Sequence, residues 1–268
     1  MTQVSTALTI AGTDPSGGAG IQADLKTFQE LKSYGMSVVT SVVSQNTTGV
    51  KDVHHLPADF IKSQLNAVSS DMPIHALKTG MIANIEMMKV VAEWIPQTTA
   101  PYVMDPVMVA TSGDALIEEE ARSLLRDHLL PLTSVVTPNI PEAEFLLGEE
   151  IKGTEDMKLA AEQICTRFQT GAVLIKGGHL EGEAVDFLYD GSKMHTFSSE
   201  RIDTKNTHGT GCTYAAAITA YLSQGAPLPL AVEKSKAFVT EAIRYSFNLG
   251  KGSGPTNHFA MRQEGVRK

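Results

Sequence analysis

The sequence predicts an α/β fold built around a central, mainly parallel β-sheet with helices on both faces. Short apolar, β-branched runs alternate along the chain with amphipathic helical patterns, and this alternation is typical of βαβ units. The predicted strands are Ala7–Ala11, Met36–Ser44, Ala76–Thr79, Tyr102–Asp105, Ser134–Thr137 and Ala172–Lys176. The predicted helices are Ile61–Val68, Ile85–Trp94, Leu116–His128, Met157–Phe168, Thr213–Ser223 and Leu230–Phe247.

One segment departs from this alternation. Within Ala184–Phe197, two short strand-like runs flank Asp190-Gly191, which is a strong hairpin signal. The sequence contains no internal repeat, low-complexity tract or Pro/Ser-rich linker. We therefore predict a single domain that spans residues 1–268.

Composition excludes several classes of function. The net charge of -8 argues against a general surface for nucleic acid or for an anionic membrane. Met1–Ala11 lacks the features of a signal peptide, and no apolar run approaches the roughly 20 residues that span a bilayer. The two cysteines, Cys165 and Cys212, have neither a metal-ligand spacing nor a disulfide framework. These observations favour a protein of the reducing cytoplasm.

A glycine-rich turn, Gly12–Gly20, connects the first predicted strand to an amphipathic helix. Such a turn lets backbone N–H groups approach a ligand at a helix N-terminus. A P-loop is disfavoured because Gly18 stands where that motif needs lysine. A dinucleotide fingerprint is disfavoured because no acidic residue lies between Glu30 and Asp52 to bind a ribose. A tight turn that binds no ligand remains an alternative.

A second glycine turn, Asn206–Thr213, leads into an alanine-rich helix. Gly209, Thr210 and Gly211 form a candidate anion site, whose N–H groups would stabilise charge on a transferring phosphoryl group. Cys212 falls in the first helical turn, where the helix dipole is expected to lower the thiol pKa. The alternative is a small buried cysteine that packs among alanines.

Polar side chains also stand at the carboxyl ends of predicted strands, where open α/β sheets gather their ligands. They are Asp105, Asn139, Glu142 and Lys176. Two carboxylates, an amide and a lysine suit a magnesium–nucleotide site, because Mg²⁺ takes oxygen ligands. Taken singly, each is more often a helix cap or a surface residue, so their convergence carries the prediction.

Eight motifs, taken in order, resemble those of the ribokinase-like superfamily. More narrowly, they are similar to its cysteine-containing vitamin kinases, which include hydroxymethylpyrimidine (phosphate) kinases and pyridoxal kinases. The motifs are Ala7–Lys26, Gln45–Val50, Lys78–Met81, Asp105–Val109, Thr137–Glu144, Ile175–His179, Asn206–Thr213 and Gly252–His258. The resemblance implies a three-layer α/β/α ribokinase-like fold, a homodimer, and the use of ATP with Mg²⁺.

The resemblance also implies roles for individual residues. The residues expected around a heterocyclic substrate are Gly12, Asp24, Gln45, Met81 and Val107; from the sequence alone, Met81 would be read as a core residue. Asn139, Lys176 and Thr210 are expected to bind ATP, and Glu142 and Asp105 to hold Mg²⁺. Gly209 and Gly211 belong to the expected anion hole. Cys212 stands where sugar kinases place a catalytic aspartate, which leaves the identity of the base open.

The implied reaction is ATP-dependent phosphorylation of the hydroxymethyl group of 4-amino-5-hydroxymethyl-2-methylpyrimidine, and of its monophosphate, in thiamine biosynthesis. A kinase for pyridoxine, pyridoxal or pyridoxamine is the alternative, and one enzyme that accepts both rings is consistent with the motifs. A binding protein that kept the fold without catalysis is a third reading. An NAD oxidoreductase is disfavoured by the missing ribose acid.

Overall fold

The computed structural model describes residues 4–107, 123–178 and 182–265. Its main sheet has the strand order β10-β9-β8-β7-β6-β5-β1-β2. Six parallel strands form most of it: β1 (Thr6–Ala11), β2 (Tyr34–Val39), β5 (Ala76–Thr79), β6 (Tyr102–Met104), β7 (Val135–Val136) and β8 (Val173–Ile175). The antiparallel hairpin β9 (Ala184–Tyr189) and β10 (Met194–Ser199) completes it. The predicted mainly parallel sheet and the hairpin at Asp190-Gly191 are confirmed.

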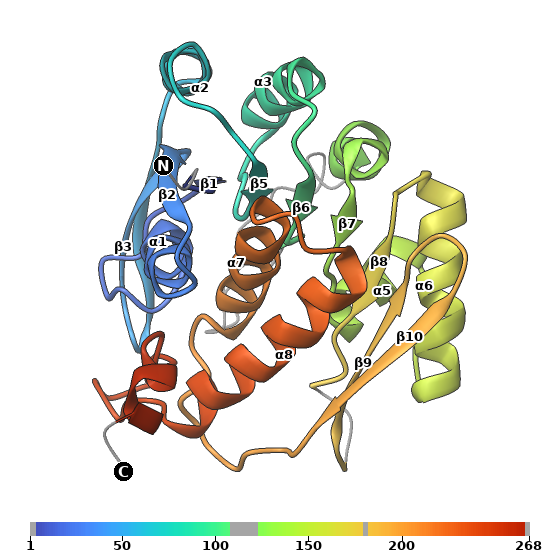
Figure 1. Ribbon diagram of the computed structural model, residues 1–268. Coiled ribbons are helices and arrows are strands. Elements are labelled where there is room, and N and C mark those ends of the chain that lie inside the picture. The colour runs from blue at the N-terminus through green and yellow to red at the C-terminus, as the bar shows by residue number, and fades with distance from the viewer. Residues whose placement is uncertain (1–3, 108–122, 179–181, 266–268) are drawn as a thin grey trace.

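Helices cover both faces of this sheet and produce three layers (Figure 1). One face carries α1 (Gly20–Glu30), α7 (Thr210–Ser223) and α8 (Leu228–Arg244). The other carries α2 (Ala58–Ser69), α3 (Ile85–Trp94), α5 (Ile140–Leu147) and α6 (Thr154–Phe168). Short helical turns occur at η1 (Ile95–Gln97), η2 (Leu125–Leu129), η3 (Leu130–Leu132) and η4 (Ala260–Gly265).

The central helix α7 lies very close to the sheet because its inward face consists of small residues. Ala215, Ala216 and Ala220 are fully buried, and α7 packs against β1, β5 and β6 as well as against α1 and α8. Successive residues of β1 point to opposite faces: Leu8 joins the core under α2 and α3, whereas Ala7 packs with Phe28 of α1. The first turn of α7 is thereby held over the carboxyl ends of the strands.

The prediction of one strand over Met36–Ser44 is wrong. The chain turns at Thr40, so that β2 stays in the main sheet while β3 (Ser41–Asn46) leaves it and pairs with β4 (Gly49–His55) in a separate antiparallel sheet. The Thr40 N–H donates to Ala11 O at 3.0 Å, and its hydroxyl donates to Met81 O at 2.9 Å. Both strands share the apolar, β-branched pattern, so the turn between them has no local signal in the sequence.

The remaining predicted elements differ only at their ends or in part of their length. The predicted helix Leu116–His128 lies partly outside the described residues, and its described C-terminal part is the π-helical turn η2. Within the described ranges, no helix is both long and apolar enough to cross a membrane.

We predict that Phe28→Ala destabilises the fold by about 3–5 kcal/mol, because it empties a fully buried site between α1, α7 and β1. The matched control is Phe60→Ala in α2, where the ring is 56% exposed and the expected change is within about 0.5 kcal/mol. Urea unfolding of the two variants and the parent measures both values. Equal midpoints for the two variants would contradict this account of the core.

Candidate active site

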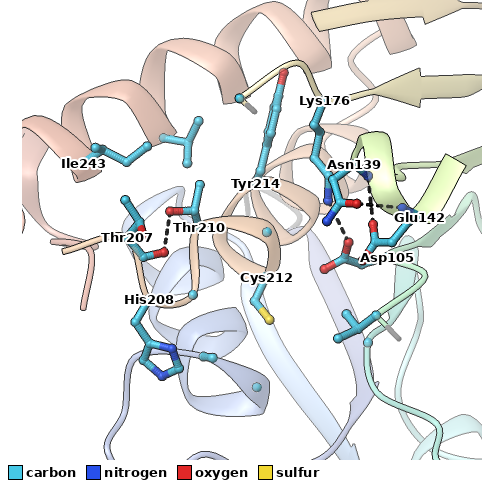
Figure 2. A pocket seen from close by; sticks show the side chains of 18 of the residues that line it. Asp105, Asn139, Glu142, Lys176, Thr207, His208, Thr210, Cys212, Tyr214 and Ile243 are labelled. Atoms are coloured by element: carbon cyan, nitrogen blue, oxygen red, sulfur yellow. Dashed lines mark hydrogen bonds and ion pairs between the residues drawn. The ribbon is translucent and has the colours of Figure 1, made fainter. Parts of the chain in front are cut away.

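A cavity of about 700 Å³ opens at the carboxyl ends of β1, β5, β6 and β8, beneath the N-terminus of α7. Parallel strands deliver their following residues to one edge of the sheet, which explains why distant motifs meet there. All predicted site residues except Asp24 line this cavity: Gly12, Gln45, Met81, Asp105, Val107, Asn139, Glu142, Lys176, Gly209, Thr210, Gly211 and Cys212. Figure 2 shows Cys212 between the His208 side and the group formed by Asp105, Glu142 and Lys176.

Asp24 does not reach the cavity. Its side chain is fully buried, and its two oxygens accept hydrogen bonds from Lys78 Nζ at 2.8 and 2.9 Å. The Thr9 hydroxyl donates to the same carboxylate at 2.6 Å. These donors occupy the carboxylate that the family resemblance assigned to the substrate. The geometry instead makes Asp24 the partner of a buried lysine that lies below the site.

The two glycine turns pack directly against each other. Gly209 has a φ of 81°, a conformation that favours glycine, and a Cβ there would overlap the carbonyl oxygen of Gly18. A Cβ on Gly211 would stand 3.4 Å from an oxygen of Asp105. Gly209 must therefore be glycine, whereas a Cβ on Gly211 would make ordinary contacts with Asp105 and Lys176. At Gly209 and Gly211, the N-terminus of α7 therefore presents backbone without side chains to the cavity.

The expectation of a lowered thiol pKa at Cys212 is wrong. Burial is the largest influence and raises the pKa of this thiol to about 12. Lys78 acts in the opposite direction, while the negative charges of Asp24 and Asp105 reinforce the increase. A hydrogen bond with the Gly20 backbone lowers the thiol pKa but does not compensate for these effects. At neutral pH the free protein therefore carries Cys212 as a thiol.

A charged cluster occupies the other side of the cavity. Lys176 Nζ lies 3.1 Å from Asp105, and Asn139 and Glu142 form a capping box at the start of α5, with both hydrogen bonds at 2.8 Å. Burial raises the pKa of Glu142 to about 7, against the lowering effect of Lys176. Burial alone would lower the pKa of Lys176, but Asp105 and Glu142 outweigh it and raise that pKa.

This cluster fits a magnesium ion that is shared with a phosphate ligand. In the described part of the chain, no three His, Cys, Asp or Glu side chains gather to form a protein-only metal site. Mg²⁺ does not need one, because it retains waters and binds through one or two carboxylates together with substrate phosphates. Asp105 and Glu142 supply that number of carboxylates. Lys176 adds a positive charge beside them.

Comparison with known proteins agrees with this geometry. The family described as phosphomethylpyrimidine kinase matches residues 14–257. The chain belongs to the phosphomethylpyrimidine kinase family. It is 47% identical over 264 residues to a hydroxymethylpyrimidine/phosphomethylpyrimidine kinase of Staphylococcus aureus, covering 97% of this chain and 96% of the relative. The predicted family and its ribokinase-like fold are thereby confirmed.

Solved structures of other vitamin kinases show the same fold. The ADP complex of Bacillus subtilis pyridoxal kinase superposes with a TM-score of 0.90 at 42% identity, over 97% of this chain and 99% of that one. A phosphomethylpyrimidine kinase from Clostridium difficile superposes with a TM-score of 0.80 at 43% identity, over 90% of this chain and 100% of that one. The family and these neighbours identify the chain as a small-molecule kinase.

Sequence reasoning missed one wall of the kinase cavity. Lys236, Val239, Thr240 and Ile243 line it from α8. Their spacing of i, i+3, i+4 and i+7 places them on one face of the helix, which the sequence can show. The sequence does not show that this face borders a cavity. Lys236 Nζ pairs at 2.7 Å with Asp186, whose other oxygen accepts the Gly177 N–H at 3.0 Å.

We predict that Glu142→Gln stabilises the ligand-free kinase at about pH 8. The carboxyl pKa is about 7 in the folded chain and 4.5 ordinarily, so ionisation of this buried group at high pH opposes folding by up to about 3 kcal/mol. Glutamine mimics the protonated acid and retains the oxygen that accepts the Asn139 N–H. The gain should shrink as the pH falls through 7 and vanish near 4.5. Thermal unfolding across this pH range measures it, and a gain independent of pH would contradict the account.

Proposed function

We propose that this kinase transfers the γ-phosphoryl group of ATP to the hydroxymethyl group of 4-amino-5-hydroxymethyl-2-methylpyrimidine, and then phosphorylates the monophosphate, in thiamine biosynthesis. The observation that supports this most is the cavity that joins both glycine turns, with the charged cluster of Asp105, Glu142 and Lys176 on one side of Cys212. The Staphylococcus aureus relative named for both phosphorylations is 47% identical along almost its whole length.

The part of the cavity beside the first glycine turn suits a flat heterocycle. Gly12, Gln45, Met81 and Val107 line it, and a Cβ on Gly12 would crowd the terminal methyl group of Met81. The absence of a side chain at residue 12 therefore leaves room for the methionine to lie against a ring. The Gln45 amide offers both a donor and an acceptor to the edge of that ring.

The charged side suits the triphosphate of ATP. In this proposal Lys176 pairs with phosphate oxygens, Asn139 and Thr210 bind the nucleotide, and Asp105 and Glu142 hold Mg²⁺. The bound Mg²⁺ would neutralise charge on the phosphates. The N–H groups that follow Gly209 at the start of α7 would stabilise the charge that develops on the phosphoryl group in transfer. Phosphoryl transfer of this type depends mainly on positioning and on charge stabilisation.

Cys212 stands where the acceptor hydroxyl would meet the phosphoryl group. The O–P bond to the acceptor forms as the bond between the γ-phosphorus and the leaving oxygen of ADP breaks, and the hydroxyl proton must leave. We propose that Cys212 first releases its own thiol proton to solvent and then receives the hydroxyl proton as thiolate. The buried Lys78 charge favours the thiolate, against the burial that raises the thiol pKa in the free chain.

A second candidate substrate is pyridoxal, because the Bacillus subtilis neighbour with a TM-score of 0.90 is a pyridoxal kinase. Steady-state kinetics with hydroxymethylpyrimidine, its monophosphate and pyridoxal, measured in parallel, test the assignment. We expect kcat/KM for the two pyrimidines to exceed that for pyridoxal by at least about tenfold, since loss of one good polar contact costs about 1–3 kcal/mol. Faster turnover of pyridoxal would reverse the order of the candidates. Binding of ATP without turnover, whichever of the three alcohols is added, would indicate a binding protein.

We also propose that the kinase acts as a cytoplasmic homodimer. Val42 on β3 and Tyr34 on the edge strand β2 are 49% and 56% exposed, so apolar surface remains uncovered in the single chain. Sedimentation equilibrium at micromolar concentration should give twice the mass of one chain. A mass equal to that of one chain would refute the dimer.

We predict that Cys212→Ala lowers kcat by about 10²–10⁴-fold and leaves ATP affinity within about threefold, because a positioned base contributes that much. Rapid-quench measurement of phosphoryl transfer and direct ATP titration separate the two quantities. Cys165→Ala is the control, since this second cysteine is buried in α6 and donates to Thr170 O away from the cavity. A loss of less than about tenfold would assign catalysis to the backbone N–H groups and charges instead.

A further inference from the structure

The carboxylate of Asp14 accepts several hydrogen bonds within the first glycine turn. It is 1% exposed, and one oxygen accepts from the N–H and the hydroxyl of Ser16 at 2.8 and 2.7 Å. The other oxygen accepts from the N–H groups of Gly18 and Ala19 at 3.1 and 2.7 Å. One side chain therefore fixes most of the turn that borders the proposed heterocycle side of the cavity.

The same oxygen also reaches the second glycine turn. His208 Nε2 lies 2.8 Å from it, across 194 residues of sequence, and both side chains line the cavity. His208 immediately precedes Gly209, whose Cα packs against the Gly18 carbonyl. The backbone of His208 is held from the far side, because its N–H donates to Gly254 O and its carbonyl accepts from the Thr256 N–H. Neither turn can shift relative to the other without breaking this contact.

Asp14 is ionised throughout the ordinary pH range. Burial alone would raise its pKa, but hydrogen bonds from His208, Gln45 and the turn hold that pKa well below its ordinary value. An ionised carboxylate can only accept, so His208 Nε2 must carry a proton. For the same reason, the Gln45 amide must turn its N–H group toward Asp14.

We propose that Asp14 and His208 are a pair of positioning residues that lock the phosphate-side turn (206–212) to the substrate-side turn (12–20) and orient Gln45 between them. This inference rests on the proposed kinase function. In-line transfer requires the acceptor hydroxyl and the γ-phosphorus to be held in near-attack geometry, and a displacement of about 1 Å can reduce the rate about 100-fold. The pair acts through the turns that hold the two ligands, not by contact with the reacting atoms.

The kinetic test compares three variants. His208→Leu removes the donor, His208→Gln restores an N–H group at similar reach, and His195→Leu is the matched control. His195 forms the same kind of pair, with Asp190 at 2.6 Å, in the β9–β10 hairpin and away from the cavity. We expect His208→Leu to lower kcat by about 10–100-fold while the dissociation constants for ATP and for hydroxymethylpyrimidine, measured by titration, stay within about threefold. His208→Gln should recover most of kcat, and His195→Leu should match the parent.

A kcat for folded His208→Leu within twofold of the parent would overturn the proposal, as would equal losses in His208→Leu and His208→Gln. A parent that turns over neither heterocycle would refute the proposed function instead, so a second measurement requires no turnover. Amide hydrogen exchange should accelerate by about tenfold in residues 206–212 of His208→Leu, and not in His208→Gln or His195→Leu. Unchanged exchange in this segment would show that the pair does not hold the two turns together.

Discussion

The buried ion pair between Lys78 and Asp24 is the interaction on which the site depends. Neither side chain has any exposed surface, and an unpaired charge at this depth would cost several kcal/mol. The ammonium group of the pair lies under the cavity floor, since a Cβ on Gly80, which lines the cavity, would lie 3.5 Å from Lys78 Nζ. A hydrophobic pair of equal volume would fill the space equally well, so packing alone does not explain these residues.

The architecture brings this charge to Cys212. Lys78 lies on β5 and Cys212 in the first turn of α7, and these two elements pack together because the inward face of α7 is made of alanine. A larger residue at Ala215 or Ala216 would lift the helix from the sheet and weaken the attraction between the ammonium and the sulfur. The small side chains of α7 are thus an electrostatic requirement as well as a packing one.

The sequence was sufficient to predict the main sheet, the family and the cavity residues at the strand ends and glycine turns, because these are local patterns. It was insufficient wherever burial decided the outcome. Asp24 could be placed on α1, but its partner Lys78 is 54 residues away on β5. The helix N-terminus suggested a reactive Cys212, whereas burial and two nearby carboxylates raise its pKa. The pairing of Asp14 with His208 required the three-dimensional arrangement of the two turns.

The raised pKa of Cys212 also bears on how the two sides of the cavity communicate. The sulfur retains its proton in the free protein partly because Asp105 is negatively charged nearby, and in the proposed function Asp105 belongs to the phosphate side. Neutralisation of Asp105 by a cation would remove one of the two carboxylates that raise the thiol pKa and would leave the attraction of Lys78 less opposed. A cation held at Asp105 would therefore lower the pKa of the Cys212 thiol relative to the free protein. The charge of Asp105 would thereby couple cation binding beside Lys176 to the ionisation of the Cys212 thiol.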